Sequence, residues 1–365
     1  MNTSNRQKIQ LTLSIAFLLI ALFTQAQTKL IPFSDPHIQY QGRVDKKQDA
    51  AILTWSGNSA TISFKGRSIS AVLQDTDTSN YYNVMVDGKM VNKIHTGRNK
   101  QTYELASGLS NKKHTLQLFK RTEWVMGQTS FYGFEAPSKT KLFSPPPLPT
   151  RKIEFYGNSI TCGYGVEDSS GKDRGIGHFE NNYITYAAIT ARHFKAQYSC
   201  IARSGIGITI SWFPQIMPEM YDKLNPSDTA SVWSFDQYTP DIVVVNLFQN
   251  DSWLVNKPDH PEFKHRFGTT TPTPEFIIDA YKKFIETIRN KYPQAHIVCI
   301  LGNMDITREG SPWPGYVEKA VSAMHDSKIY THFVPFKNSG GHPNIREQQL
   351  IADGLIAFIE KNISW

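Results

Sequence analysis

The fold is decided by the stretch Arg151-Lys152-Ile153-Glu154-Phe155-Tyr156-Gly157-Asn158-Ser159-Ile160-Thr161-Cys162-Gly163-Tyr164-Gly165. Its first five residues form a short run of alternating apolar and polar side chains, which is typical of a β-strand. The glycines that follow allow a tight loop and the close approach of a ligand to the backbone. Ser159 would therefore lie at the carboxyl end of a strand. In an open α/β sheet, ligands bind at the edge that these strand ends form. The same residues are also compatible with an ordinary surface turn. The rest of the chain decides between a ligand-binding loop and such a turn.

Strand and helix patterns alternate after this stretch. Strands are expected at 197–202, 241–247, 296–301 and 329–334, and helices at 182–194, 274–292, 315–326 and 343–363. The continuous apolar run within 241–247 is typical of a strand that is buried on both faces of a parallel sheet. The alternation predicts an α/β fold, with a parallel sheet flanked by helices.

Before this stretch, from Ile31 to about Pro145, the pattern is all-β. Apolar and polar residues alternate in three short runs, at 60–64, 69–73 and 81–86, and further strands are expected at 114–121 and 130–134. Asp87-Gly88 directly after the third run is a strong hairpin signal, and the whole pattern predicts a sandwich. The proline-rich segment 144–149 forms a stiff linker. We therefore expect a β-sandwich domain at 27–145 and a second domain at 146–365.

The first 26 residues have the features of a secretory signal peptide. Arg6 and Lys8 precede an apolar core, Leu11 to Phe23, that is too short and wrongly flanked for a stable membrane span. Small residues at Thr24-Gln25-Ala26 suit cleavage before Gln27. We expect a secreted or periplasmic protein that has no membrane contact after cleavage; a retained N-terminal anchor is the alternative.

Composition narrows the class of partner. The 365-residue chain has a formal net charge of +7, but its basic residues form no run or stripe, so nucleic acid is not an expected partner. Three cysteines are too few for a disulfide-stapled scaffold; Cys200 and Cys299 are either buried thiols or a single disulfide. The eleven histidines are dispersed and form no His-Glu-x-x-His motif, so neither a metal nor another cofactor is expected.

Three further loops are expected on the same sheet edge as Ser159. These loops are 202–205, 248–251 and 340–343. Acyl transfer needs a hydroxyl nucleophile, a base that takes its proton, and donors aimed at the developing oxyanion. Ser159, His342, and the Gly205 amide with the Asn250 side chain can fill these roles in turn. A lone histidine before a helix is more often structural, so it is the four loops together that indicate a site.

The order of these blocks resembles the SGNH hydrolases, also called GDSL esterases. Gly157-Asn158-Ser159, Gly205, Asn250-Asp251 and His342-Pro343 resemble their first, second, third and fifth blocks. The whole chain, with a β-sandwich before the hydrolase domain, resembles carbohydrate esterase family two. The residues that carry this second resemblance are Gly42-Arg43, 120–123, 159–165 and 186–192. The resemblance implies a jelly roll followed by a flavodoxin-like α/β/α domain, and removal of O-acetyl groups from plant-cell-wall polysaccharide of the xylan or mannan type.

The sequence departs from the family pattern at three positions. Asn158 replaces an aspartate before the serine, which should have a mild effect. Phe248 replaces a glycine, and this would narrow the pocket or move Asn250. Ser339 replaces the aspartate three residues before His342.

Ser339 bears most directly on the mechanism, because a hydroxyl cannot stabilise an imidazolium as a carboxylate does. We therefore predict a Ser159–His342 dyad in which a main-chain carbonyl from 337–341 holds the histidine. The alternative is a carboxylate from elsewhere, Asp251 or Glu167, that completes a triad.

Three tryptophans lie in or near the same loops, Trp212, Trp253 and Trp313. Each would offer an indole face for a sugar ring, or would equally well pack its loop against the sheet. The leading interpretation is a secreted serine esterase acting on acetylated polysaccharide or oligosaccharide. The alternatives are an esterase for another acyl ester and a catalytically weak carbohydrate-binding protein.

Overall fold

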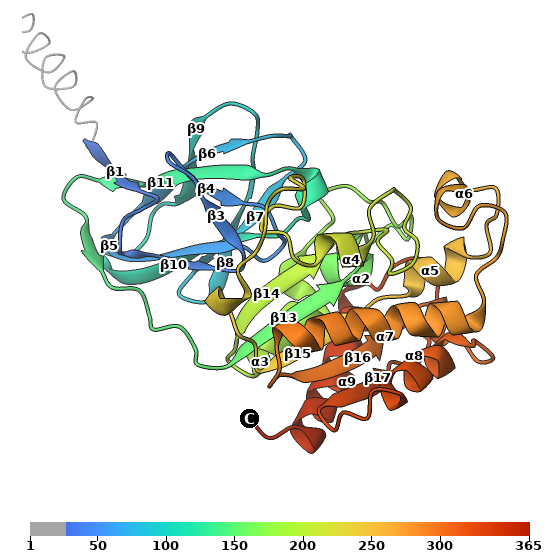
Figure 1. Ribbon diagram of the computed structural model, residues 1–365. Helices are drawn as coiled ribbons and strands as arrows, with labels where there is room; N and C mark the ends of the chain where they lie inside the picture. Colours follow the sequence, from blue (N-terminus) through green and yellow to red (C-terminus); the bar gives the residue numbers. More distant parts are fainter. Residues whose placement is uncertain (1–26) are drawn as a thin grey trace, which may run out of the picture.

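The computed structural model describes residues 27–365, so the predicted signal peptide lies outside the described residues (Figure 1). Within this range, residues 28–143 form two antiparallel sheets that face each other. One sheet has the order β3-β4-β11-β6-β9, with β1 paired to β11, and comprises β1 (Thr28–Pro32), β3 (Val44–Lys46), β4 (Ala51–Leu53), β6 (Ile69–Asp75), β9 (Gln101–Ala106) and β11 (Thr129–Pro137). The other has the order β12-β5-β10-β7-β8, with β2 paired to β5, and comprises β2 (Ile38–Gln41), β5 (Ser59–Gly66), β7 (Tyr81–Val86), β8 (Lys89–His95), β10 (Lys112–Lys120) and β12 (Lys141–Phe143).

The sandwich follows from its sequence pattern. Strand β6 alternates strictly between buried and half-buried residues, as a strand with one face in the core must. Asp87 and Gly88 join β7 to β8 with φ angles of 51° and 78°. Two successive positive φ angles are those of a tight hairpin turn whose twist matches the strands. The predicted sandwich and hairpin are confirmed.

The second part of the chain is a five-stranded parallel sheet in the described residues. Its strands are β13 (Lys152–Gly157), β14 (Gln197–Ala202), β15 (Ile242–Asn246), β16 (His296–Leu301) and β17 (Ile329–Phe333), in the order β14-β13-β15-β16-β17. In order of appearance this is 2-1-3-4-5, the flavodoxin-like arrangement. The predicted α/β fold is confirmed.

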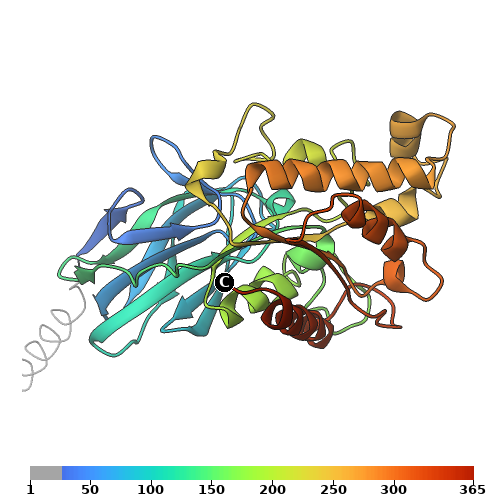
Figure 2. The same ribbon diagram turned by 60° about the horizontal axis from the view of Figure 1, so that its bottom comes forward.

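Helices cover both faces of this sheet (Figure 2). Val243 and Val245 point into a core with α7 and α8, whereas Ile242 and Val244 point into a core with α3 and α9. The α-helices are α2 (Ser159–Cys162), α3 (Tyr186–His193), α4 (Met217–Met220), α5 (Gln249–Leu254), α6 (Pro261–Phe267), α7 (Pro274–Lys291), α8 (Trp313–Ser322) and α9 (Ile345–Asn362). Short 3₁₀ turns are η1 (Trp124–Met126), η2 (Asn182–Ile184), η3 (Phe235–Gln237) and η4 (Asp305–Thr307). The helix expected from 182 to 194 is thus divided, because Thr185 has extended backbone and caps α3 with its side chain.

The sandwich contacts the α/β part through two buried arginines. Arg43 donates to the Tyr156 hydroxyl at 3.1 Å and to the carboxylate of Glu154 at 3.3 Å. Arg121 donates to the main-chain carbonyl of Glu180 at 2.8 Å. Both guanidinium groups are nearly inaccessible, so the two parts meet through a buried polar contact.

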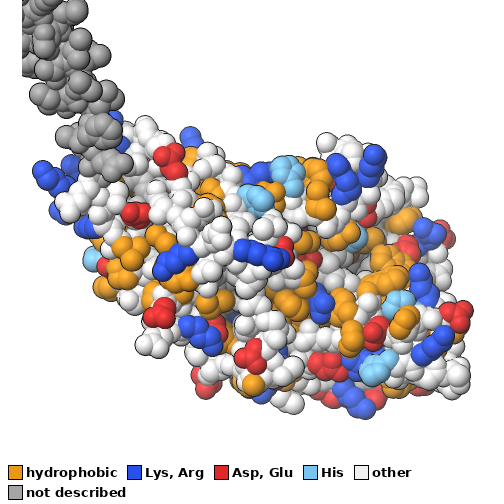
Figure 3. Space-filling model, turned by 90° about the horizontal axis from the view of Figure 1, so that it is seen from above, with side chains coloured by type: hydrophobic (Ala, Val, Ile, Leu, Met, Phe, Trp, Pro, Cys, Tyr) orange, Lys and Arg blue, Asp and Glu red, His pale blue; other side chains and the backbone are white. Residues whose placement is uncertain are grey.

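All three cysteines of the chain lie in the described residues and are free and buried. The alternative of a Cys200–Cys299 disulfide is therefore wrong, and both residues are buried thiols. On the face shown in Figure 3, lysine and arginine side chains are scattered among acidic and apolar ones. Within 27–365, no helix has the length and apolar character needed to cross a membrane.

Candidate active site

The loops that follow β13, β14 and β15 lie at one edge of the sheet. Gly157 at the end of β13 is in register with Ala202 of β14 and with Asn246 of β15. The Arg203 amide donates to the Gly157 carbonyl at 3.3 Å, which ties the loop after β14 to the serine loop. A Cβ on Gly157 would lie 2.0 Å from Thr161 Oγ1, so the chain can turn into α2 here only with glycine.

Ser159 is the first residue of α2, and it faces His342. Its Oγ lies 2.8 Å from His342 Nε2, a hydrogen-bonding distance. Asn158 caps the helix, because its side-chain oxygen accepts from the Ile160 amide at 3.0 Å. The side chain that stands in place of aspartate therefore fixes the start of the serine helix.

The group that holds the other side of His342 is a carboxylate, Asp173. Its two oxygens lie 2.8 and 3.1 Å from His342 Nδ1. An ionised carboxylate only accepts hydrogen bonds, so the Nδ1 atom carries the proton and Nε2 is free to accept from the Ser159 hydroxyl. The predicted main-chain carbonyl from 337–341 is therefore wrong as the orienting group.

Neither carboxylate considered as the alternative contacts His342. Asp251 is fully buried and accepts from the main-chain amides of 208–210 at 2.7 to 3.3 Å. It shapes the loop after β14. Glu167 forms an ion pair with Arg121 of the sandwich.

Ser339 forms its side-chain hydrogen bonds with residues other than His342. Its hydroxyl donates to Glu347 at 2.6 Å and accepts from Lys337 Nζ at 2.8 Å. It ties the histidine loop to the first turn of α9. Ser339 is therefore not the group that orients His342.

A folded loop between α2 and α3 presents Asp173. Asp168 accepts from the main-chain amide of Arg174 at 3.0 Å and from its guanidinium at 2.8 and 2.9 Å. Asp173 itself has a left-handed backbone with φ 54°, a conformation that aspartate tolerates better than most residues. A Cβ on Gly341 would lie 3.1 Å from the Asp173 carboxyl carbon, so glycine next to His342 leaves room for the acid.

The charge state of the acid suits this role. Burial on its own acts to raise the pKa of Asp173, but the hydrogen bond from His342 and the nearby positive charge hold that pKa below its usual value. Tyr164 packs on the imidazole with ring centroids 4.4 Å apart. Burial raises the pKa of Tyr164, so this neighbour stays neutral.

The two predicted oxyanion donors lie on neighbouring loops. Gly205 has a left-handed backbone, φ 84°. Asn250 is in the first turn of α5 and is buried. Its amide nitrogen donates to the Ile206 carbonyl at 2.8 Å, and its amide oxygen accepts from Trp212 Nε1 at 3.1 Å. A primary amide nitrogen carries two protons, so one remains for a ligand.

The three tryptophans differ in their surroundings. Trp212 is 39% exposed and Trp253 is partly buried, with its indole nitrogen bonded to Asp305 at 2.8 Å. Trp313 is 6% exposed and packs against Phe248 with centroids 5.0 Å apart. The expectation that Trp313 offers a face to a sugar is therefore wrong, because its ring belongs to the core.

Phe248 does not narrow the site. Its ring is fully buried and packs against Tyr281, with centroids 4.7 Å apart, as well as against Trp313. Its backbone is left-handed, φ 77°, the conformation that a glycine adopts freely. The side chain thus packs in the core with residues of α7 and α8.

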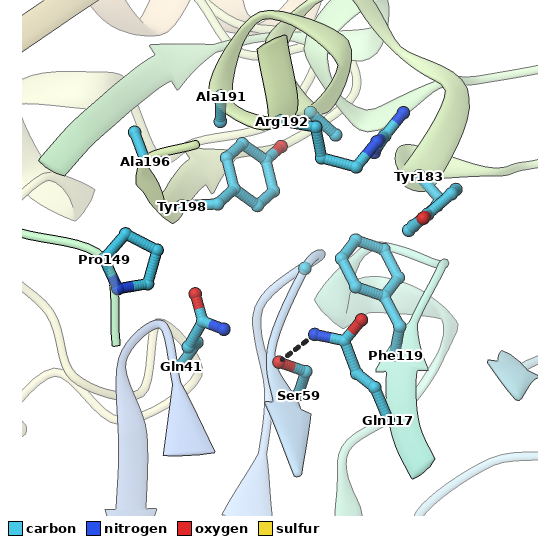
Figure 4. A pocket seen from close by; sticks show the side chains of 12 residues that line it. Gln41, Ser59, Gln117, Phe119, Pro149, Tyr183, Ala191, Arg192, Ala196 and Tyr198 are labelled. Carbon is cyan, nitrogen blue, oxygen red and sulfur yellow. Dashed lines mark hydrogen bonds between the residues drawn. The ribbon is translucent and has the colours of Figure 1, made fainter. Parts of the chain in front are cut away.

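A separate cavity of about 120 Å³ lies between the sandwich and α3 (Figure 4). Pro149 and Ala196, which line it, come just before β13 and β14. It therefore opens at the amino ends of the strands, whereas Ser159 lies at their carboxyl ends. Among residues 27–365, no cluster of three or more His, Cys, Asp or Glu side chains is arranged to hold a metal ion.

Comparisons with known proteins cover nearly all of this architecture. Residues 40–146 match the family described as carbohydrate esterase 2 N-terminal, and residues 155–354 match the GDSL-like lipase/acylhydrolase family. The cellulase/esterase CelE of Acetivibrio thermocellus is 34% identical over 351 residues, which is 91% of this chain but only 40% of that relative's length. An acetylxylan esterase/glucomannan deacetylase of Cellvibrio japonicus is 24% identical over 93% of both chains.

Solved structures agree with the sequence matches. A family two carbohydrate esterase from Clostridium thermocellum, in complex with cellohexaose, is 34% identical with a TM-score of 0.79, and the match covers 88% of this chain and 98% of that one. A family two carbohydrate esterase from Cellvibrio japonicus, at 23% identity and a TM-score of 0.81, has the same fold. Because both family models and a solved structure agree along the sandwich and the α/β domain, the chain belongs to family two of the carbohydrate esterases, within the GDSL-like (SGNH) hydrolases.

Proposed function

We propose that this protein is a secreted serine esterase that removes O-acetyl groups from plant-cell-wall polysaccharide of the xylan or mannan type. The observation that carries the proposal is the chain of contacts from Asp173 through His342 to Ser159. A hydroxyl, a neutral imidazole and a carboxylate in this order are what nucleophilic attack on an ester requires. Secretion rests on the signal-like sequence of the first 26 residues.

The first half of the reaction transfers the acetyl group to the enzyme. Ser159 Oγ attacks the acetyl carbonyl carbon while His342 Nε2 takes the hydroxyl proton. The carbonyl oxygen becomes an oxyanion, which accepts from the Gly205 amide and from the free proton on Asn250 Nδ2. The bond to the sugar oxygen then breaks, that oxygen takes the proton from His342, and the acetyl group stays on Ser159.

The second half releases acetate by the same groups. His342 takes a proton from water, the water oxygen attacks the acetyl carbon, and the same donors hold the oxyanion. The bond to Ser159 Oγ breaks and the serine recovers its proton from His342. Asp173 keeps the imidazole oriented and stabilises its positive charge in both halves.

The substrate class rests on the relatives and on the exposed indole beside the donors. One relative is named an acetylxylan esterase/glucomannan deacetylase, and another was solved with cellohexaose bound. Trp212 is exposed and contacts Asn250 directly. Indole faces stack on the apolar faces of sugar rings, so this side chain and Trp253 are the residues that we propose contact the polysaccharide.

The test of the substrate class is a panel of esters given to the purified mature chain. We expect acetate release from acetylated xylan or acetylated glucomannan, and faster hydrolysis of p-nitrophenyl acetate than of p-nitrophenyl butyrate. Hydrolysis of the p-nitrophenyl esters without acetate from either polysaccharide would indicate a different acyl ester. Oligosaccharide binding without turnover of any ester would indicate a binding protein, a role that an intact serine–histidine–carboxylate arrangement disfavours.

A further inference from the structure

Trp212 contacts both predicted oxyanion donors. Its main-chain amide donates to the Gly205 carbonyl at 3.1 Å, and its indole nitrogen donates to Asn250 Oδ1 at 3.1 Å. The Gly205 φ of 84° and the turn back at Trp212 belong to the same loop after β14. Trp212 is 39% exposed, although Asn250, which its indole nitrogen bonds, is only 3% exposed.

The chemistry of the indole restricts how Asn250 can lie. A carboxamide can rotate by half a turn and exchange its oxygen and nitrogen, with little change in shape. The indole nitrogen is a donor only, so it requires the amide oxygen to face it. The nitrogen then faces the Ile206 carbonyl, which takes one of its two protons at 2.8 Å. The second proton is the one that the proposed mechanism uses.

We propose that Trp212 is a positioning residue for the oxyanion hole: its indole N–H fixes the orientation of the Asn250 amide, in addition to any stacking of its ring on substrate. This inference rests on the proposed function, because it assumes that Asn250 donates to the oxyanion. Without the indole N–H, only Ile206 selects between the two amide orientations, and a buried amide oxygen loses its partner. Loss of one neutral hydrogen bond corresponds to roughly a two- to tenfold change in kcat.

The test is a double-mutant cycle with Trp212→Phe and Asn250→Ala, measured on p-nitrophenyl acetate and on acetylated polysaccharide. Phenylalanine keeps an aromatic face but has no N–H. We expect Trp212→Phe to lower kcat on both substrates by about two- to tenfold. In the Asn250→Ala background the same change should have no further effect on kcat, because there is no amide to orient.

Trp55→Phe is the matched control. It also removes an indole N–H bond, here to the Leu224 carbonyl at 2.8 Å, but at the contact between the sandwich and the α/β domain. We expect its kcat to remain at the wild-type value. This control separates the loss of any indole bond from the loss of the bond at Asn250.

The outcomes separate this inference from the proposed function. If Trp212→Phe changes only KM for the polysaccharide, or lowers kcat equally with and without Asn250, the positioning role is wrong and the proposed function still stands. If Asn250→Ala alone leaves kcat unchanged, the oxyanion role of Asn250 in the proposed function fails. Circular dichroism and thermal unfolding of each variant show whether the fold is kept.

Discussion

His342 is fixed from three directions by side chains that lie far from it in the sequence. Ser159 lies at its Nε2 atom, Asp173 at its Nδ1 atom and the Tyr164 ring on its face. Ser159 and His342 were predictable, because each lies in a loop that the sequence places at the carboxyl edge of a predicted sheet. Asp173 was not, because its position depends on a left-handed backbone and on the Asp168–Arg174 contact, which no local pattern signals. A polar loop at this edge was the only available hint.

The contact at Nδ1 predicts which substitutions reduce turnover. Asp173→Asn should lower kcat by about ten-thousandfold, the loss typical of an orienting aspartate, since the amide favours the wrong imidazole tautomer. Ser339→Ala should change kcat by less than about twofold, because that hydroxyl bonds Lys337 and Glu347 instead. Steady-state turnover of p-nitrophenyl acetate checks both. A larger loss for Ser339→Ala than for Asp173→Asn would return the orienting role to the 337–341 loop.

At the scale of elements, the long strands and helices of the sheet were predicted well because they are strongly periodic. Helix α7 (Pro274–Lys291) has its proline in the first turn, and Thr273 caps it. The short helices α4, α5 and α6 were not predicted. They are too short to show a helical period, and packing and main-chain bonds such as those to Asp251 set their positions instead.

At the junction of β15 and α5, one residue combines an unfavourable backbone conformation with favourable packing of its side chain. Phe248 has φ 77° and a fully buried ring. A left-handed non-glycine residue costs about 1–2 kcal/mol, whereas deleting a buried phenylalanine ring costs about 3–5 kcal/mol. The core packing therefore outweighs the strain.

Two variants of Phe248 should therefore differ in stability, with glycine less destabilising than alanine. Phe248→Gly should lower the free energy of unfolding by about 2–3 kcal/mol, since it relieves the strain but loses the packing. Phe248→Ala should lower it by about 1 kcal/mol more, because alanine keeps the strained Cβ. Urea unfolding of the three proteins measures both differences. An alanine variant as stable as the glycine variant would show that the left-handed backbone carries no strain.

At the scale of the whole molecule, the sandwich reaches the catalytic edge through Glu123. This buried carboxylate accepts from the Ser204 amide at 2.8 Å, next to Gly205. The Glu123 amide in turn donates to the carboxylate of Glu180. Burial raises the pKa of both carboxyl groups, and that of Glu180 is raised further by the charge of Glu123. The overall two-part architecture followed from the sequence, but this buried contact between the parts did not, because it joins residues from separate loops.

The raised pKa of Glu180 predicts a pH dependence of stability. The folded protein keeps a proton that the unfolded chain releases above the ordinary glutamate pKa of about 4.3. Between the ordinary and the raised pKa, the folded state therefore binds more protons than the unfolded state. The free energy of unfolding falls as pH rises through this interval, by at most about 1.4 kcal/mol per pH unit. Glu180→Gln cannot ionise and keeps an acceptor for the Glu123 amide. Its free energy of unfolding should fall less steeply with pH than that of the wild type.

Denaturant unfolding of both proteins at several pH values from 5 to 8 measures that difference. At the upper end of the range the variant should be at least as stable as the wild type. An identical pH dependence in both proteins would show that Glu180 is ionised in the folded state.

The most direct test of the account is the rate of acetate release from acetylated polysaccharide by the wild type and by Ser159→Ala. The Oγ atom of Ser159 is the group that bonds to the acetyl carbon, so its removal should reduce the rate by several orders of magnitude; loss of a serine nucleophile costs about a million-fold in subtilisin. The variant should keep the wild-type fold by circular dichroism, because one oxygen atom is lost. Acetate release by the folded variant at a rate within about tenfold of the wild type would contradict the account.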